Sequence, residues 1–276
     1  MLVVLLPSLY YNNQNLDLSL QASLSVRFNI REFMNYYHPK FDLEPASQAV
    51  DLEEAQAFRY KAFGVVNESG LDRDEYDKKF NHVIIRDRKH RRVVGCFRYT
   101  YYNPGSLIQT GYSAAHYDIK ALENFDQPLM EVGRVCTDFS LKDPDILRLV
   151  WAYLAHYVER RKIGFIFGCT SFEGIDHGKY IDCFAILRER YLGPKKLLPS
   201  VKSPSVLKFS KALRPDVNFK IAMLKMPPLL RAYLSMGGWV SDHAVIDYKL
   251  NTLHVFTGLE VRKIPHEKKR FLMNKP

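Results

Sequence analysis

Residues 129–172 read LMEVGRVCTDFSLKDPDILRLVWAYLAHYVERRKIGFIFGCTSF and carry the clearest secondary-structure signals of the chain. The apolar run at 129–137 predicts a strand, and SLKDPD predicts the turn after it. A helix is expected from Ile146 to Arg161, with Asp145 as its cap. FIFGC (165–169) is continuously apolar, which indicates a strand buried on both faces. The helix prediction rests on an apolar stripe formed by Leu147, Val150, Trp151, Leu154, Tyr157 and Val158.

Two charged residues, Glu131 and Arg134, stand inside the first of these strands. Burying them costs free energy unless they pair or take part in chemistry. Side chains alternate along a regular strand, so these two would point to opposite faces. Gly133 permits a β-bulge, which would bring both charges to one cleft and free a backbone N–H for a substrate carbonyl. The residues alone leave two interpretations open: a buried ion pair, or a site that removes a proton and stabilises an oxyanion.

The segments before this stretch extend the same pattern. A strand is expected near Lys40–Pro45, and a helix is expected to open at Asp51, which forms a capping-box pattern with Glu54. Residues 64–80 form a loop rich in acidic side chains. A hairpin should follow, with HVIIRD (82–87) and RVVGCFRYTYY (92–102) as its strands.

Later segments add helices and one more strand. Helices are expected over Tyr180–Tyr191 and in LLRAYLSM (229–236), and a last strand over 253–261. Residues 1–39 lack clean periodicity and are predicted to be an N-terminal extension with a short strand at Ser25–Ile30. Residues 40–276 are predicted to be one α/β domain, a mixed and mainly antiparallel sheet with helices on both faces.

Composition excludes several classes of protein. The chain has 276 residues, of which 47% are hydrophobic and 25% charged, which is typical of a soluble globular protein. No run is long enough to predict a membrane-spanning helix, and MLVVLLPSLYY lacks the basic start of a signal peptide. Cysteines 96, 136, 169 and 183 form no CxxC pair, so neither a disulfide framework nor a metal site is predicted. A reducing, cytoplasmic location is expected.

The net charge of +10 is concentrated in one segment. Between Arg188 and Arg231, eleven Lys or Arg residues face two acidic residues, a net of +9. Such a segment attracts acidic proteins or anionic lipid, although it could also be a solvated face that keeps the protein soluble. Nucleic acid is not predicted as a partner, because the segment has no groove-reading or base-stacking motif.

Several motifs in order resemble one known family. EVGRVC (131–136), DILRLVWAYLAHYV (145–158) and FIFGCTSFEG (165–174) are similar to the ornithine N-acyltransferases that begin ornithine-lipid synthesis. That family belongs to the GNAT superfamily and is related to the acyl-homoserine-lactone synthases. The resemblance extends over 41–261 through AQAFRYKAF, DEYDKKFNHVIIRD, RRVVGCFRY, YSAAHYDI, MPPLLRAYLSMGGWV and LNTLHVF.

The resemblance implies a GNAT-like fold and a reaction. A 3-hydroxyacyl chain would move from acyl carrier protein to the α-amine of L-ornithine, giving lyso-ornithine lipid. The amine would attack the thioester directly, with no bound cofactor and with acyl-phosphopantetheine on the carrier protein as donor. No nucleophile is then needed, and Cys136 and Cys169 are expected to be structural.

The resemblance also implies the site residues. Related enzymes have an Arg and a Phe on the first helix, acids after it, an Arg on the hairpin and a Glu-x-x-Arg strand. The matching positions are Arg59, Phe63, Asp74, Asp77, Arg98, Glu131 and Arg134. Glu131 is expected to take the proton of the amine, directly or through water. Asp74 and Asp77 would bind ammonium, and Arg98 or Arg134 would bind the carboxylate. Structural ion pairs between these arginines and acids are the alternative.

One turn departs from the GNAT pattern. Enzymes that use coenzyme A commonly have a glycine-rich turn here, whose N–H groups hold pyrophosphate. FSLKDPDIL (139–147) has no glycine, two acids and Lys142, which favours a carrier-protein donor. Carrier proteins are acidic, so part of the basic segment could steer docking or hold the enzyme peripherally on anionic membrane. The residues proposed for that contact are Lys195, Lys196, Lys202, Lys208 and Lys211.

Two alternatives remain open. One is a transferase like the acyl-homoserine-lactone synthases, which uses S-adenosylmethionine or another amine. The C-terminal match MPPLLRAYLSMGGWV (226–240) favours the ornithine branch. The other is a catalytically inert GNAT-like module that binds carrier protein or lipid. Retention of Glu131 and Arg134 together with the acidic loop argues against loss of activity.

Overall fold

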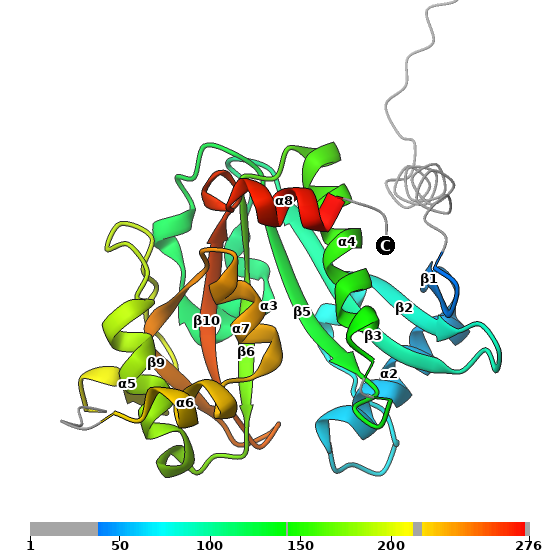
Figure 1. Ribbon diagram of the computed structural model, residues 1–276, viewed down its shortest axis with the longest axis horizontal. Coiled ribbons are helices and arrows are strands. Elements are labelled where there is room, and N and C mark those ends of the chain that lie inside the picture. The colour runs from blue at the N-terminus through cyan, green and yellow to red at the C-terminus, as the bar shows by residue number, and fades with distance from the viewer. Residues whose placement is uncertain (1–37, 142, 212–216, 274–276) are drawn as a thin grey trace, which may run out of the picture. The chain divides into compact units, whose positions relative to one another are not determined.

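A twisted sheet is the centre of the computed structural model, which describes residues 38–141, 143–211 and 217–273 (Figure 1). Within these residues, eight strands pair in the order β1-β2-β3-β5-β6-β10-β9-β8. The β5–β6 pair is parallel, and the other neighbours in this sheet are antiparallel. The bounds are β1 Phe41–Pro45, β2 Asn81–Asp87, β3 Val93–Tyr102, β5 Leu129–Thr137, β6 Phe165–Glu173, β8 Val206–Lys208, β9 Trp239–Asp247 and β10 Thr252–Glu260.

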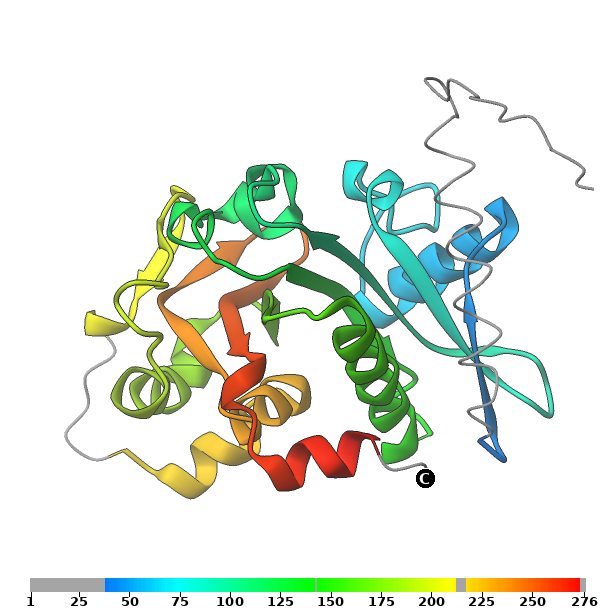
Figure 2. The ribbon, with the colours of Figure 1, turned by 90° about the horizontal axis from the view of Figure 1, so that it is seen from above.

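Helices cover both faces of this sheet (Figure 2). Helices α2 (Ala49–Phe63) and α3 (Tyr112–His116) lie behind the sheet in the view of Figure 1. The front is covered by α4 (Pro144–Arg161), α5 (Ile181–Arg190), α6 (Phe219–Lys225), α7 (Pro228–Ser235) and α8 (His266–Met273). The predicted fold class, a mixed and mainly antiparallel sheet with helices on both faces, is confirmed.

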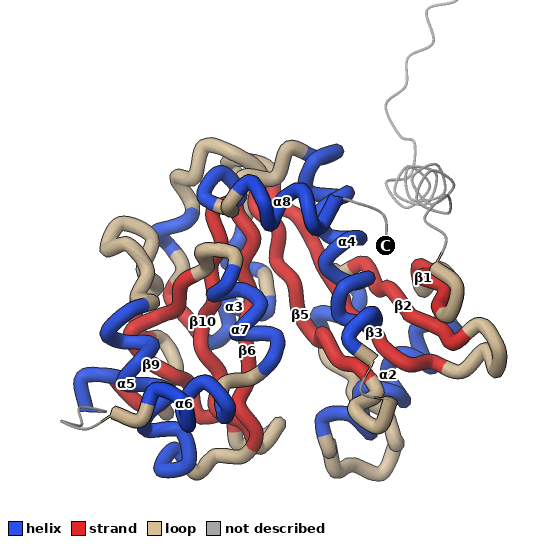
Figure 3. The backbone as a smooth tube through the Cα atoms, in the orientation of Figure 1, coloured by secondary structure: helices blue, strands red, loops and turns tan. Residues whose placement is uncertain are grey.

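The core is divided between the two faces because side chains alternate along each strand. On β6, Phe165 and Phe167 pack with Tyr117 and Phe256 on the α3 side, whereas Phe172 packs with α5 residues such as Phe184. A smaller cluster joins α2 to the hairpin through Ala55, Ile84 and the buried Cys96 and Cys136. Strands β3 and β5, which carry Arg98, Glu131 and Arg134, belong to this sheet, with helices on both of its faces (Figure 3).

The predicted cap positions are wrong by one turn or less. Gln48, not Asp51, is the N-cap of α2, and Asp51 occupies the third helical position, where its side chain accepts from the Gln48 N–H. Helix α4 is capped by Asp143 instead of Asp145, because Pro144 is well suited to the first helical position. The same helix ends at Arg161, as predicted, and its C-cap Lys162 adopts the left-handed conformation.

Several elements were not predicted from the sequence. Strand β9 lacks an alternating pattern because it is buried on both faces along most of its length, with Asp242 as its one exposed residue. A two-stranded ribbon of β4 (Tyr117–Asp118) and β7 (Ser200–Val201), together with β8, α3, α6 and α8, is too short for a periodic signal. The predicted extension and its strand at Ser25–Ile30 fall on 1–37, outside the described residues. In the part of the chain that is described, no helix combines the length and apolar character needed to span a bilayer.

Candidate active site

A β-bulge in β5 orients the two charged residues of this strand. Arg98 of β3 pairs with Gly133, whereas Cys96 pairs with Cys136, so β5 holds one extra residue between the two pairs. The bulge was predicted at Gly133, but the residue in the left-handed conformation is Arg134, with φ 51°. A non-glycine residue rarely adopts this conformation, so the surrounding contacts of Arg134 must stabilise it.

Those contacts are an alternating network of three arginines and three aspartates. Arg59 of α2 binds Asp72 (2.9 Å) and Asp77 (2.9 Å). Arg98 binds Asp74 (2.6 Å) and Asp77 (2.6 Å). Arg134 closes the network on Asp72 (2.9 Å) and Asp74 (3.0 Å). The structure thus brings together five predicted site residues from α2, the acidic loop, β3 and β5.

Aromatic rings cover the arginines of this network. The Arg134 guanidinium lies 5.0 Å from the Tyr112 ring centre and 5.9 Å from that of Phe63, the predicted aromatic residue of α2. The Arg98 guanidinium lies 5.0 Å from the Phe80 ring centre. Such contacts exclude water and strengthen the ion pairs beside them.

The network differs in exposure from one pair to the next. The side chains of Arg59 and Arg98 are 1% exposed, whereas those of Arg134 and Asp74 are 9% and 11% exposed. Burial opposes the charge of Asp77, but hydrogen bonds and charge from Arg59 outweigh it and hold the pKa of this carboxyl well below its ordinary range. The Arg134–Asp74 pair is therefore the part of the network that a polar ligand reaches most readily.

Glu131 is buried beside this network and binds helix α3. Its carboxylate accepts a hydrogen bond from the Tyr102 hydroxyl at 3.0 Å and another from the backbone N–H of Ser113, in the first turn of α3. Burial raises the pKa of Glu131, and the two hydrogen bonds only partly oppose this. A carboxyl with a raised pKa is suited to proton transfer near neutral pH, although this one also fixes the start of α3.

Strands β5 and β6 pair only over their first residues. The parallel ladder ends at Glu131 and Phe167, and beyond it the two strands diverge (Figure 1). At Gly168 a Cβ would lie 2.1 Å from the carbonyl oxygen of Val132, so this close approach requires glycine. The ladder therefore ends beside the carboxylate that is the predicted base.

An apolar cavity of about 570 Å³ lies on the α4 side of the sheet. Its lining comes from α4, the adjacent strands β6 and β10, and the C-terminal segment, and includes Trp151, Leu154, Ile166, Met236, Leu259 and Ile264. Its size and lining are typical of a site for a small apolar ligand or an alkyl chain.

The basic segment is only partly available for a partner. Lys195, Lys196 and Lys208 are exposed, and the side chain of Lys211 lies outside the described residues. Lys202 is also exposed, but its Nζ donates to the carbonyl oxygen of Ala114 at 2.6 Å and so links this segment to α3.

Sequence reasoning missed three participants. Asp72 was counted in the acidic loop but not chosen, although it bridges Arg59 and Arg134. Tyr102 and Tyr112 are aromatic residues among many, and only the fold places them against Glu131 and Arg134. Burial raises the pKa of the Cys136 and Cys169 thiols, which disfavours the nucleophilic thiolate and agrees with the structural role expected for both.

Comparison with known proteins gives a domain type for part of the chain and names the enzymes to which the chain is similar. Residues 55–152 match the acetyltransferase (GNAT) domain model. An L-ornithine N(alpha)-acyltransferase of Rhodobacter capsulatus is 25% identical over 245 residues, which cover 84% of this chain and 94% of that protein. A protein of the same name from Brucella abortus is 27% identical over 240 residues, covering 79% and 84%. The chain is an N-acyltransferase whose residues 55–152 match a GNAT domain.

The resemblance inferred from the sequence motifs is thereby confirmed. Among solved structures, an N-acyl amino acid synthase from uncultured soil microbes aligns with a TM-score of 0.47 and 10% identity, covering 82% of this N-acyltransferase and 93% of that chain. The matched GNAT domain contains all six network residues and Glu131.

Proposed function

We propose that this N-acyltransferase moves a 3-hydroxyacyl chain from acyl carrier protein to the α-amine of L-ornithine, giving lyso-ornithine lipid. The observation that carries the proposal is similarity along almost the whole length of relatives named L-ornithine N(alpha)-acyltransferase. The site supports it, because a buried carboxylate lies beside paired arginines and aspartates, which suit an amino acid that is both cationic and anionic.

The amino acid is proposed to bind at the Arg134–Asp74 pair. Arg134 would bind its carboxylate, and Asp74 would bind an ammonium group. Arg59, Arg98 and Asp77 are more deeply buried and would hold this pair in position. Glu131 would then take the proton released when the amine attacks the thioester carbon, as the thiol of phosphopantetheine leaves.

Carrier protein is the proposed donor because the turn before α4 is poorly suited to pyrophosphate. Asp143 caps the helix through the N–H of Asp145 at 3.0 Å and binds Lys40 at 2.9 Å. The positive end of the helix is thus already occupied by the protein's own carboxylates. Lys142 lies outside the described residues. Exposed lysines of the basic segment would contact the acidic carrier protein, and a peripheral position on anionic membrane is a further expectation.

The assay for this proposal uses purified protein, L-ornithine and 3-hydroxyacyl carrier protein. Free thiol should appear in step with lyso-ornithine lipid, which mass spectrometry identifies. Acyl-coenzyme A of the same chain length should be a much poorer donor. Product with another amine but none with ornithine would refute the substrate assignment, and thiol release without an amide product would refute the reaction.

The apolar cavity is proposed to receive the acyl chain. Ala155 lines it, so Ala155→Trp should fill it and lower kcat/KM for a long-chain donor by at least about tenfold, since each buried CH₂ is worth about 0.8 kcal/mol. A 3-hydroxybutyryl donor should be affected little. Val66, which is 95% exposed, offers the matched control Val66→Trp. Equal losses with both donors would show general damage and place the acyl chain elsewhere.

A further inference from the structure

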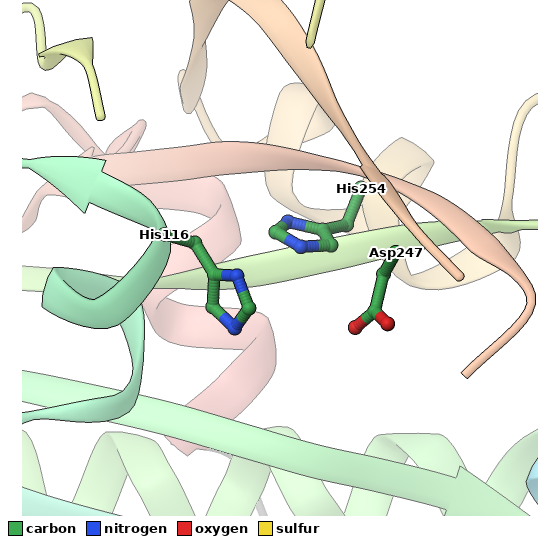
Figure 4. A group of neighbouring side chains, drawn as sticks. All are labelled: His116, Asp247 and His254. Carbon is green, nitrogen blue, oxygen red and sulfur yellow. The ribbon is translucent and has the colours of Figure 1, made fainter. Parts of the chain in front are cut away.

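Three side chains that the reaction does not use converge near Tyr112, whose ring contacts one of them. His116 ends α3, Asp247 ends β9 and His254 lies in β10 (Figure 4). One ligand atom from each lies within 4.8 Å of the other two. Among the described residues, no hydrogen bond or ion pair joins these three side chains to one another. The three side chains surround a common point, and none of them serves as a hydrogen-bond or ion-pair partner for another.

The protonation of His254 follows from its neighbour Tyr117. The Tyr117 hydroxyl donates to the backbone carbonyl oxygen of His254 at 2.7 Å and lies 3.3 Å from Nδ1 of the same residue. The hydroxyl has one hydrogen and gives it to the carbonyl, so we assign His254 the tautomer in which Nδ1 carries the proton and donates to the Tyr117 oxygen. Nε2 is then a lone-pair acceptor. It is buried, with no partner within the described residues, on a residue that is 1% exposed.

Asp247 and His116 also offer hydrogen-bond acceptor atoms to the same point. Asp247 is 9% exposed, and within the described residues its Oδ1 accepts from the Leu250 N–H at 2.9 Å. His116 is half-buried and offers an imidazole nitrogen to the same point. A carboxylate and two imidazole nitrogens facing one buried point cost free energy unless a cation lies between them.

We propose that His116, Asp247 and His254 bind a divalent transition-metal ion of the zinc class. Two imidazoles with one carboxylate suit zinc and its neighbours, whereas magnesium and calcium prefer oxygen ligands alone. Three protein ligands leave a fourth position open. Tyr117 on Nδ1 of His254 and the Leu250 N–H on Asp247 are the outer contacts that orient metal ligands.

The charges around the cluster permit a cation. The nearest arginine is Arg134: the Tyr112 ring centre lies 4.9 Å from the His116 ring centre and 5.0 Å from the Arg134 guanidinium. Its charge is balanced by Asp72 and Asp74. Lys202 is bound to the Ala114 carbonyl. Asp247 is therefore available to balance the metal, and the metal would stabilise the end of α3 whose start binds Glu131.

The test is metal binding by chelator-treated, untagged protein, independent of any acyltransferase assay. Titration calorimetry with Zn²⁺ should show one equivalent bound, and Co²⁺ should give visible absorption bands typical of low coordination number. His116→Ala and Asp247→Asn should each weaken Zn²⁺ affinity by more than about 100-fold, since loss of outer-shell contacts alone costs 10–100-fold. His177→Ala, at an exposed position that starts a short 3-10 helix, is the control and should bind normally.

Two results would overturn the proposal. One is the absence of a stoichiometric site in folded protein, and the other is Zn²⁺ binding that His116→Ala and Asp247→Asn leave unchanged. Circular dichroism shows whether each variant is folded. If neither metal binds and Asp247→Asn raises KM for ornithine, the cluster receives an ammonium group and the metal assignment is wrong.

Discussion

Glu131→Gln should lower kcat by about 10²–10⁴-fold while leaving the fold intact. The amine can attack only when neutral, and the amide of Gln cannot take its proton. Gln keeps the size of the side chain, and one of its polar atoms can still accept from the Ser113 N–H or the Tyr102 hydroxyl. Initial rates of thiol release at saturating ornithine and donor measure the effect.

The pH profile separates a base from a residue that only fixes α3. Because burial raises the pKa of Glu131, kcat/KM should fall as pH decreases through that raised value, and Glu131→Gln should abolish this limb. Tyr102→Phe is the matched control. It removes one hydrogen bond to the carboxylate, which should shift the limb to higher pH but keep it. Full activity of Glu131→Gln at every pH would assign the base elsewhere.

The central strand is where sequence and structure agree most closely. The prediction 129–137 matches β5, and the hairpin, α4 and β6 also lie where predicted, because each has a long apolar pattern. The clustering of the network residues follows from the family resemblance and not from spacing, since α2, the acidic loop and β3 are separate in sequence. Their roles in catalysis stay predictions.

The features that could not be predicted from the sequence depend on tertiary contacts. The left-handed conformation of Arg134 depends on its aromatic and carboxylate neighbours, and a glycine next to it was the more obvious place for the bulge. Asp72 resembles its acidic neighbours until the loop folds over Arg59. His116 and His254 are 138 positions apart and meet only because α3 packs behind β10. No local sequence motif marks them as a pair, so the cluster could not be predicted from the sequence.

Asp77→Ala should destabilise the protein by about 3–5 kcal/mol, the usual cost of removing one partner from a buried ion pair. Asp77 accepts from Arg59, from Arg98 at 2.6 Å and from the Gln56 amide at 2.9 Å. Its loss leaves two arginine side chains, each 1% exposed, with one carboxylate apiece. Urea unfolding followed by fluorescence measures the difference.

An exposed pair of the same region provides the control for that measurement. Glu53 lies 3.9 Å from Arg73, and both side chains are more than half exposed, so Glu53→Ala should change stability by less than about 0.5 kcal/mol. Because the pKa of Asp77 is lowered on folding, its stabilisation is present above the unfolded-state pKa near 4 and is lost as pH falls below it. Asp77→Asn should therefore reduce the loss of stability on acidification. Equal effects of the Asp77 and Glu53 variants would mean that the network is hydrated and that its arginines are free to bind substrate.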